Sequence, residues 1–258
     1  MNKILNQVLD FPSMINSKLP MNNFNSMVDD SENNVAKWTG MAYNVSALLV
    51  LLTSLLAILS PIWSGGMGEG LGVIGNVLAM LIWAYAAFPI AQMVRATGDG
   101  LADSKSGIVS FIFRDLALAN IKLVGKIAAL SAFFGALCMT LSWATSINVS
   151  GGFMMDWIDN IAYFTSLPMA AVAVLANTMG LGFVSNILAN DWANWDPTMA
   201  AGAAWSPNGF VALLWEYVGV LVILAKMFVN LAIYSFFYGI IRSLVRWIQS
   251  PYIPIKTS

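Results

Sequence analysis

Several apolar runs, each about 20 residues long, constrain this chain more than any other feature. The first is AYNVSALLVLLTSLLAILSPIW, residues 42–63, and further runs cover 71–94, 127–143, 161–187 and 209–241. A helix of about 20 apolar residues spans the ~30 Å hydrocarbon core of a bilayer. The ten-residue alternation of a membrane β-barrel is absent from the sequence. The sequence therefore predicts an all-α, polytopic transmembrane helical bundle with about five spans.

The composition argues against several classes of cofactor, metal site and partner. Charged residues make up 10% of the chain, against about 25% in a typical soluble domain. There is no histidine, and the single cysteine, Cys138, lies inside an apolar run. Histidine-ligated haem, thiolate zinc sites, iron–sulfur clusters and internal disulfides are therefore not expected. With a net charge of −1 and no basic block, we also expect no nucleic-acid partner.

The domain organisation follows from where the apolar runs begin and end. Residues 1–37 form a polar leader without the apolar core and cleavage site of a signal peptide. Residues 38–249 form the transmembrane helical domain, and 250–258 form a C-terminal tail. Because neither a cleavable signal nor a eukaryotic targeting segment is recognisable, we expect the bacterial inner (plasma) membrane.

A glycine-rich stretch between the first two runs contains GLGVIG, with glycines at 70, 72 and 75. This spacing matches the dinucleotide fingerprint, which requires a preceding strand in a βαβ unit. Here both flanks are membrane spans. We therefore expect a tight hairpin whose glycines let two helices approach closely.

Residues 107–126 mix apolar and charged side chains at helical spacing, which predicts an interfacial amphipathic helix leading into the third span. The end of the last helix has a similar polar side. Five basic residues of these two segments are expected to anchor lipid or a partner: Arg114, Lys122, Lys126, Arg242 and Arg246. Within the third span, small residues recur at four-residue spacing at Ala128, Ala132 and Ala136, a pattern suited to close helix packing.

The charge distribution gives conflicting indications of topology. Five of the twelve basic residues lie between Arg95 and Lys126, which places this segment in the cytoplasm together with the N-terminal leader. Five spans would then put the C-terminus outside. Arg242 and Arg246, at the end of the last helix, instead indicate the inside.

The last run continues without proline from about Gly209 to Gln249, which predicts a single helix about 60 Å long, twice the hydrocarbon thickness. It carries three intramembrane polar candidates: Glu216, Lys226 and Asn230. Lys226 and Asn230 are four residues apart and share a helix face. Either they form a polar stripe facing a cavity or another subunit, or the bilayer is shifted along the helix and Lys226 snorkels at its edge.

These features favour a non-catalytic integral subunit of a larger membrane complex, with the bilayer and other membrane subunits as partners. The overlong last helix, the packing stripe and the lack of a nucleophile–base pair in the sequence indicate this role, for example in a secretion or respiratory machine. The alternative is a small-solute transporter or channel that uses Lys226 and Asn230. A membrane enzyme is less favoured, since its best candidates, Asp99 and Asp103, are those expected of a solvated turn.

Overall fold

The computed structural model describes residues 24–149, 173–183 and 204–249. In chain order these form α2 (Phe24–Ser64), α3 (Leu71–Ala102), α4 (Ile108–Ser110), the π-helix η1 (Phe111–Leu116), α5 (Ala117–Thr145) and α8 (Pro207–Gln249), and the described ranges contain no strand. Four helical stretches of this part of the chain are long and apolar enough to cross a membrane. They are Asn34–Ser64, Leu71–Ala102, Ile108–Thr145 and Pro207–Ile248.

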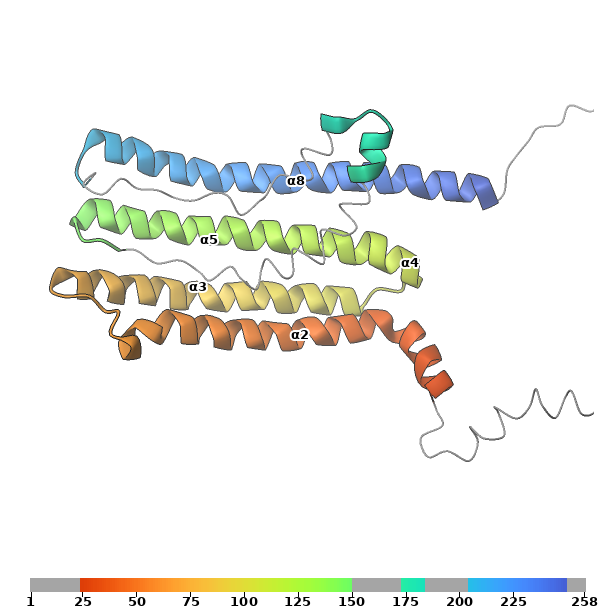
Figure 1. Ribbon diagram of the computed structural model, residues 1–258, viewed down its shortest axis with the longest axis horizontal. Coiled ribbons are helices and arrows are strands. Elements are labelled where there is room, and N and C mark those ends of the chain that lie inside the picture. The colour runs from red at the N-terminus through yellow and green to blue at the C-terminus, as the bar shows by residue number, and fades with distance from the viewer. Residues whose placement is uncertain (1–23, 150–172, 184–203, 250–258) are drawn as a thin grey trace, which may run out of the picture.

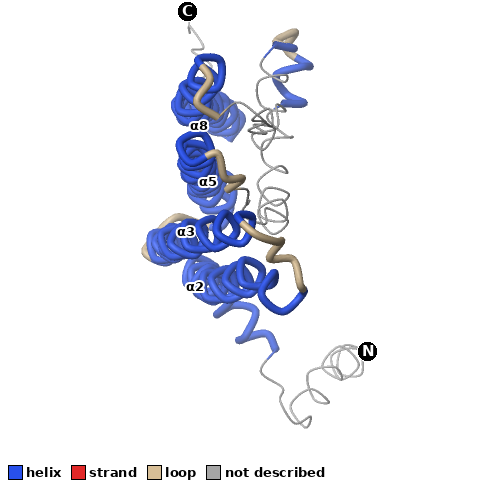
Figure 2. The backbone as a smooth tube through the Cα atoms, turned by 90° about the vertical axis from the view of Figure 1, so that its left-hand side faces the viewer, coloured by secondary structure: helices blue, strands red, loops and turns tan. Residues whose placement is uncertain are grey.

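The four long helices stand side by side in a single layer, in the order α2, α3, α5, α8 (Figures 1 and 2). In this arrangement α2 and α8 form the two opposite edges of the layer. Each helix packs on the next one along the layer. α5 is the most enclosed, with 44% of its apolar window buried against 17% for α2. The layer thus has two broad apolar faces that are suited to lipid or to other subunits, and residues 173–183 pack on part of it beside Ala117, Tyr234 and Phe237.

Glycines shape the connection between α2 and α3. Gly65, Gly68 and Gly70 all have positive φ, a conformation that residues with a Cβ seldom adopt. Gly75 lies where an added Cβ would come within 2.2 Å of the carbonyl oxygen of Asn148. The connection between α2 and α3 is therefore a glycine turn that ends at Gly70, while the rest of the GLGVIG stretch forms the start of α3, where Gly75 allows the backbone that follows α5 to approach closely.

Small side chains line the contacts inside the layer. Ala79, Ala86 and Ala87 of α3 are buried in a cluster that also holds α5 residues. In α5, Ala128 and Ala136 are buried, while Ala132 is partly buried and packs towards α8. The predicted small-residue stripe of the third span accordingly lies within the layer, where it allows close approach of neighbouring helices.

Residues 108–126 do not turn away from the third span. α4, η1 and α5 follow one another without a loop and form one gently curved rod (Figure 1). An amphipathic helix lying in the membrane plane would instead need a bend where it meets the span. α8 likewise runs unbroken over the range in which the sequence predicts one long helix.

Most of the predicted span 161–187 lies outside the described residues, as do most of the leader and the C-terminal tail. Its described part, 173–183, is helical over 173–178 and then turns. The turn places Gly180 at φ 79° and lets the Leu181 N–H donate to the carbonyl of Ala176 at 2.8 Å. This is a common way for a helix to stop at a glycine, so the described part of this run is not one continuous helix.

Candidate functional site

Polar side chains gather at the end of the layer where α2 enters, α3 ends and α5 begins. The Asn44 side-chain amide donates to the Asp99 carboxylate at 3.0 Å, which joins α2 to α3. The Tyr43 hydroxyl donates to the side-chain carbonyl of Asn120, which joins α2 to α5. We call this the basic end, because most of the lysines and arginines of the described residues lie here.

The opposite end of the layer is rich in aromatic residues. The ring of Trp143 lies 5.3 Å from that of Trp205 and 5.6 Å from that of Phe210, and its indole N–H donates to the Ser206 carbonyl at 3.3 Å. Trp63 is exposed at the end of α2. Tryptophans concentrate at membrane–water interfaces, so this aromatic end is suited to the headgroup region. Two further tryptophans, Trp192 and Trp195, lie outside the described residues.

From the aromatic end, each long helix runs through a mostly apolar window to a polar or charged residue near the basic end, although the α3 window contains Asn76 and Gln92 and the α8 window contains Glu216. The windows cover 45–64 of α2, 71–94 of α3, 127–145 of α5 and 207–225 of α8, and they end at Asn44, Arg95, Lys126 and Lys226. At 1.5 Å per residue they are about 28–36 Å long, close to the ~30 Å hydrocarbon core. We infer that the hydrocarbon boundary passes through these four residues.

The packing of α5 on α8 confirms that Lys126 and Lys226 lie at one level. A Cβ added to Gly125 would meet the Met227 side chain at 2.5 Å, so Gly125 and Met227 are level. Because α5 and α8 run in opposite directions, Lys126 and Lys226 are each one residue closer to the aromatic end and are therefore level too. Lys226 is exposed. Its ammonium therefore reaches the headgroup region directly, which agrees with the snorkelling interpretation.

The three intramembrane polar candidates do not form one site in this chain. Asn230 is 3% exposed and lies on the face of α8 that packs against α5, together with Met227 and Tyr234, whereas Lys226 is exposed. Glu216 is partly buried about midway along its window, about 15 Å along the helix axis from Lys226. Its neighbour Tyr217 shares a hydrogen bond of 2.9 Å with Thr140 of α5.

The densest polar network at the basic end is built around Asp115 of η1. One carboxylate oxygen accepts from the Arg114 guanidinium at 2.6 Å, and the other accepts from the hydroxyls of Ser104 and Ser106, each at 2.6 Å. Arg114 also donates to the Ser106 hydroxyl at 2.7 Å. We call these four residues the Asp115 knot. It fixes the loop between α3 and α4 against the start of the α5 rod.

The knot keeps its carboxylate ionised. Partial burial raises the pKa of Asp115, but the hydrogen bonds from Arg114, Ser104 and Ser106 and the charge of the guanidinium outweigh burial and lower it to about 2. A carboxyl group whose pKa is lowered by folding stabilises the folded protein at every pH above its ordinary pKa. This stability is lost only as the pH falls through the lowered pKa. The loop is therefore held across the whole physiological pH range.

The π-helix η1 is tied to α8 by a buried tyrosine. Tyr234 is 1% exposed, and its hydroxyl donates to the backbone carbonyl of Phe113 at 2.6 Å. Short π-helices inside α-helical rods are uncommon and frequently occur at functional sites. Here η1 presents Arg114 and Asp115 to the loop and its Phe113 carbonyl to α8, so the two contacts share one helical turn.

Arg242 and Arg246 lie apart from this knot. Both are exposed on the last turns of α8, well beyond the level of Tyr234. The structure thus separates the five predicted anchoring residues into two sets. Arg114, Lys122 and Lys126 lie beside the α3–α5 contact, and the two arginines of α8 lie further from the inferred boundary.

Sequence reasoning missed the polar partners at the basic end. Ser104 and Ser106 resemble ordinary loop serines, and Tyr43 and Asn120 are 77 positions apart, so no local pattern pairs them. Asp99, a candidate enzyme residue from the sequence, accepts a hydrogen bond from Asn44 and lies 3.9 Å from the Arg95 guanidinium. Among the described residues, no group of three or more carboxylate or cysteine side chains is arranged to hold a metal.

Comparisons with known proteins give no further guide to the site: no protein-family model, curated protein or solved structure matches the chain.

The boundary placement predicts unequal effects of two substitutions in α8. Tyr234→Phe removes a buried hydrogen bond, and we expect a loss of about 0.5–1.5 kcal/mol in the free energy of unfolding. Lys226→Met removes an exposed ammonium, and we expect a change within about 0.5 kcal/mol. Thermal unfolding of both purified variants in the same detergent measures the difference. A larger loss for Lys226→Met than for Tyr234→Phe would show that Lys226 has a structural partner.

Proposed function

We propose that this chain is a non-catalytic integral subunit of a larger membrane complex. In this proposal the part of α8 beyond Lys226 contacts an apolar helix of a neighbouring membrane subunit. One observation carries the proposal: residues 227–248 extend about 33 Å past the inferred boundary, yet many of their large apolar side chains are exposed. These are Phe228, Val229, Phe236, Leu244, Val245, Trp247 and Ile248.

A water-exposed surface of this kind is unfavourable in an isolated chain. Burying one large apolar side chain is worth about 1.5–3 kcal/mol, so covering seven of them is worth on the order of 10 kcal/mol. This is comparable with the 4–15 kcal/mol cost of association. Exposed apolar patches rimmed by polar residues commonly mark protein–protein contacts.

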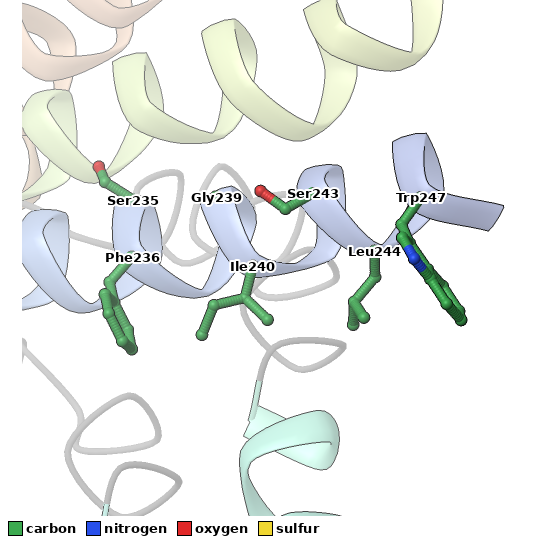
Figure 3. Close-up of a pocket in the computed structure, with 7 residues that line it drawn as sticks. All are labelled: Ser235, Phe236, Gly239, Ile240, Ser243, Leu244 and Trp247. Carbon is green, nitrogen blue, oxygen red and sulfur yellow. The ribbon is translucent and has the colours of Figure 1, made fainter. Parts of the chain in front are cut away.

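The shape of this surface is suited to a helix. Ser235, Gly239 and Ser243 follow one another at four-residue spacing, beside the larger Phe236, Ile240, Leu244 and Trp247 (Figure 3). Together these seven residues line an open groove of about 660 Å³. A Cβ added to Gly239 would meet nothing within 4 Å. A row of small residues next to a row of large ones allows two helices to approach closely.

The proposal predicts the effect of filling this groove. We expect Gly239→Leu to reduce the native mass of the complex extracted in mild detergent from an assembly to a single chain, because the leucine occupies the space of the partner helix. The matched control is Gly72→Leu, at a helical glycine of α3 where an added Cβ would also meet nothing within 4 Å. Native mass and subunit identity would be measured for both variants and the parent. A parent that purifies as a stable monomer would contradict the proposal.

The alternative function, transport through a stripe of Lys226 and Asn230, has less support. A common transport path needs both side chains to line it, and in this chain one is exposed and the other is buried against α5. We also propose that the membrane is a bacterial inner membrane and that the basic end lies on its cytoplasmic side. The positive-inside rule supports this orientation.

A further inference from the structure

An open cleft of about 780 Å³ lies at the basic end between the end of α3, the following loop and the start of the α5 rod. Four basic side chains line it: Lys105, Arg114, Lys122 and Lys126. The carboxylates in its lining are those of Asp103 and Asp115. The cleft therefore carries an excess of two positive charges, although the whole chain has a net charge of −1.

The Asp115 knot determines which of these charges are available. Asp115 is occupied by Arg114 and by the two serine hydroxyls, so it offsets the guanidinium. Lys105, Lys122 and Lys126 are all exposed. Their three ammonium groups face only one further carboxylate in the lining, that of Asp103.

The knot also determines where the lysines lie. Lys122 and Lys126 are one helical turn apart, and both line the cleft from α5. Lys105 approaches from the loop, between the two serines that are hydrogen-bonded to Asp115. Because the residues on both sides of Lys105 are hydrogen-bonded to Asp115, Lys105 is kept beside the cleft. Ammonium groups thus converge on one space from two separate segments.

The edge of the cleft nearest the membrane centre lies at the inferred hydrocarbon boundary. Lys126 lies at the inferred hydrocarbon boundary, and the same line of α5 continues towards the membrane centre with the partly buried Leu130 and the exposed Phe133. On α3, helical spacing from Thr97 leads through Met93 and Pro89 to the exposed Tyr85. A basic cleft that opens onto an apolar surface at headgroup depth is suited to a molecule with a phosphate at one end and hydrocarbon at the other.

We propose that this cleft binds the phosphate of an anionic phospholipid headgroup, held by Lys105, Lys122 and Lys126, with its acyl chains along the face formed by α3 and α5. Basic pockets between transmembrane helices commonly hold anionic headgroups. The α8 arginines, Arg242 and Arg246, take no part in this site. It differs from the subunit contact proposed above, which lies on the outer groove of α8.

The test compares two double variants of the full-length protein that remove the same amount of charge. Delipidated protein in detergent is titrated with phosphatidylglycerol and with phosphatidylcholine, and bound lipid is measured by native mass spectrometry. We expect Lys122→Gln with Lys126→Gln to weaken phosphatidylglycerol binding at least tenfold. We expect Arg242→Gln with Arg246→Gln to weaken it less than threefold. Equal losses in the two double variants would overturn the site, because binding would then follow overall charge.

Two further arms keep the test decisive. Lys105→Gln changes only the loop, and we expect it to weaken binding several-fold without altering the unfolding temperature; unchanged binding would contradict the proposed convergence. Inorganic phosphate in millimolar excess is added as a competitor. Displacement of the lipid would show that phosphate alone is recognised, and lack of displacement would show that the acyl chains are also required. Binding of phosphatidylcholine as tight as that of phosphatidylglycerol would overturn the proposal.

Discussion

Gly98→Ala is expected to destabilise the protein by about 1–3 kcal/mol, the usual cost of overpacking a close contact. A Cβ at position 98 would lie 2.6 Å from the Cβ of Tyr43 and 2.9 Å from the carbonyl oxygen of Gly40. Both are on or next to the backbone of α2, so neither can move away by rotating a side chain. The change must therefore separate α2 from α3 at the basic end, where Asn44 and Asp99 are hydrogen-bonded.

A control lies two residues further along the same helix. A Cβ at Gly100 would meet nothing within 4 Å, so Gly100→Ala adds helix propensity without a clash. We expect it to leave stability unchanged or to raise it by up to about 1 kcal/mol. Thermal unfolding in detergent gives the change in unfolding temperature of each variant relative to the parent protein. We expect the two changes to have opposite signs or to be clearly different in size. If both variants unfold like the parent protein, α2 and α3 are not in backbone contact at Gly98.

The helices themselves follow from local sequence signals. The apolar runs at 42–63, 71–94, 127–143 and 209–241 all fall inside observed helices, because each run is long enough to satisfy its backbone only as a helix in lipid. The predicted start of the second run coincides with the start of α3, where glycines of positive φ end the preceding turn. The number of crossings is harder to predict, since the run at 161–187 is interrupted at Gly180.

The arrangement of the helices does not follow from the runs. Apolar residues surround each helix on most sides, so periodicity does not show which face meets a neighbour. A closed bundle and a single layer use the same small-residue contacts. The Asp115 knot is equally hidden, because Ser104 and Ser106 obtain their role from a carboxylate about ten residues away. The sequence predicts Arg114, Lys122 and Lys126 as anchors, but neither Lys105 nor the convergence of these side chains on one cleft.

The depth of Lys226 in the bilayer can be inferred only from how α8 is aligned with the other helices. In the sequence, its position relative to the bilayer depends on which half of a helix of 43 residues lies in lipid. In the structure, Gly125 against Met227 sets it level with Lys126. If the boundary inferred above is correct, the remaining apolar residues of α8 lie beyond the bilayer, and the proposed subunit contact is the groove around Gly239.

The positions of the helix ends also bear on the conflicting indications of topology. Thr145, at the end of α5, and Ser206, before α8, lie at the same aromatic end, as the Trp143–Trp205 contact shows. Whatever path joins them, it begins and ends at one side of the layer. α2, α3, the α5 rod and α8 then place the start of α2 and the end of α8 at the same end. Lys37, Arg242 and Arg246 are thus together on the side that the positive-inside rule assigns to the cytoplasm.

Cysteine labelling at the two edge helices should therefore give an all-or-none result. The native Cys138 is buried, and Cys138→Ala provides a thiol-free parent. In sealed cells we expect an impermeant maleimide to label Ser64→Cys and Asn208→Cys, but to label Lys37→Cys and Arg242→Cys, which lies outside the α8 groove, only after the membrane is permeabilised. All four positions are exposed, so accessibility within the protein does not limit the reaction. Opposite results for Lys37→Cys and Arg242→Cys would mean an odd number of crossings, and would overturn both the shared basic end and the boundary inferred from it.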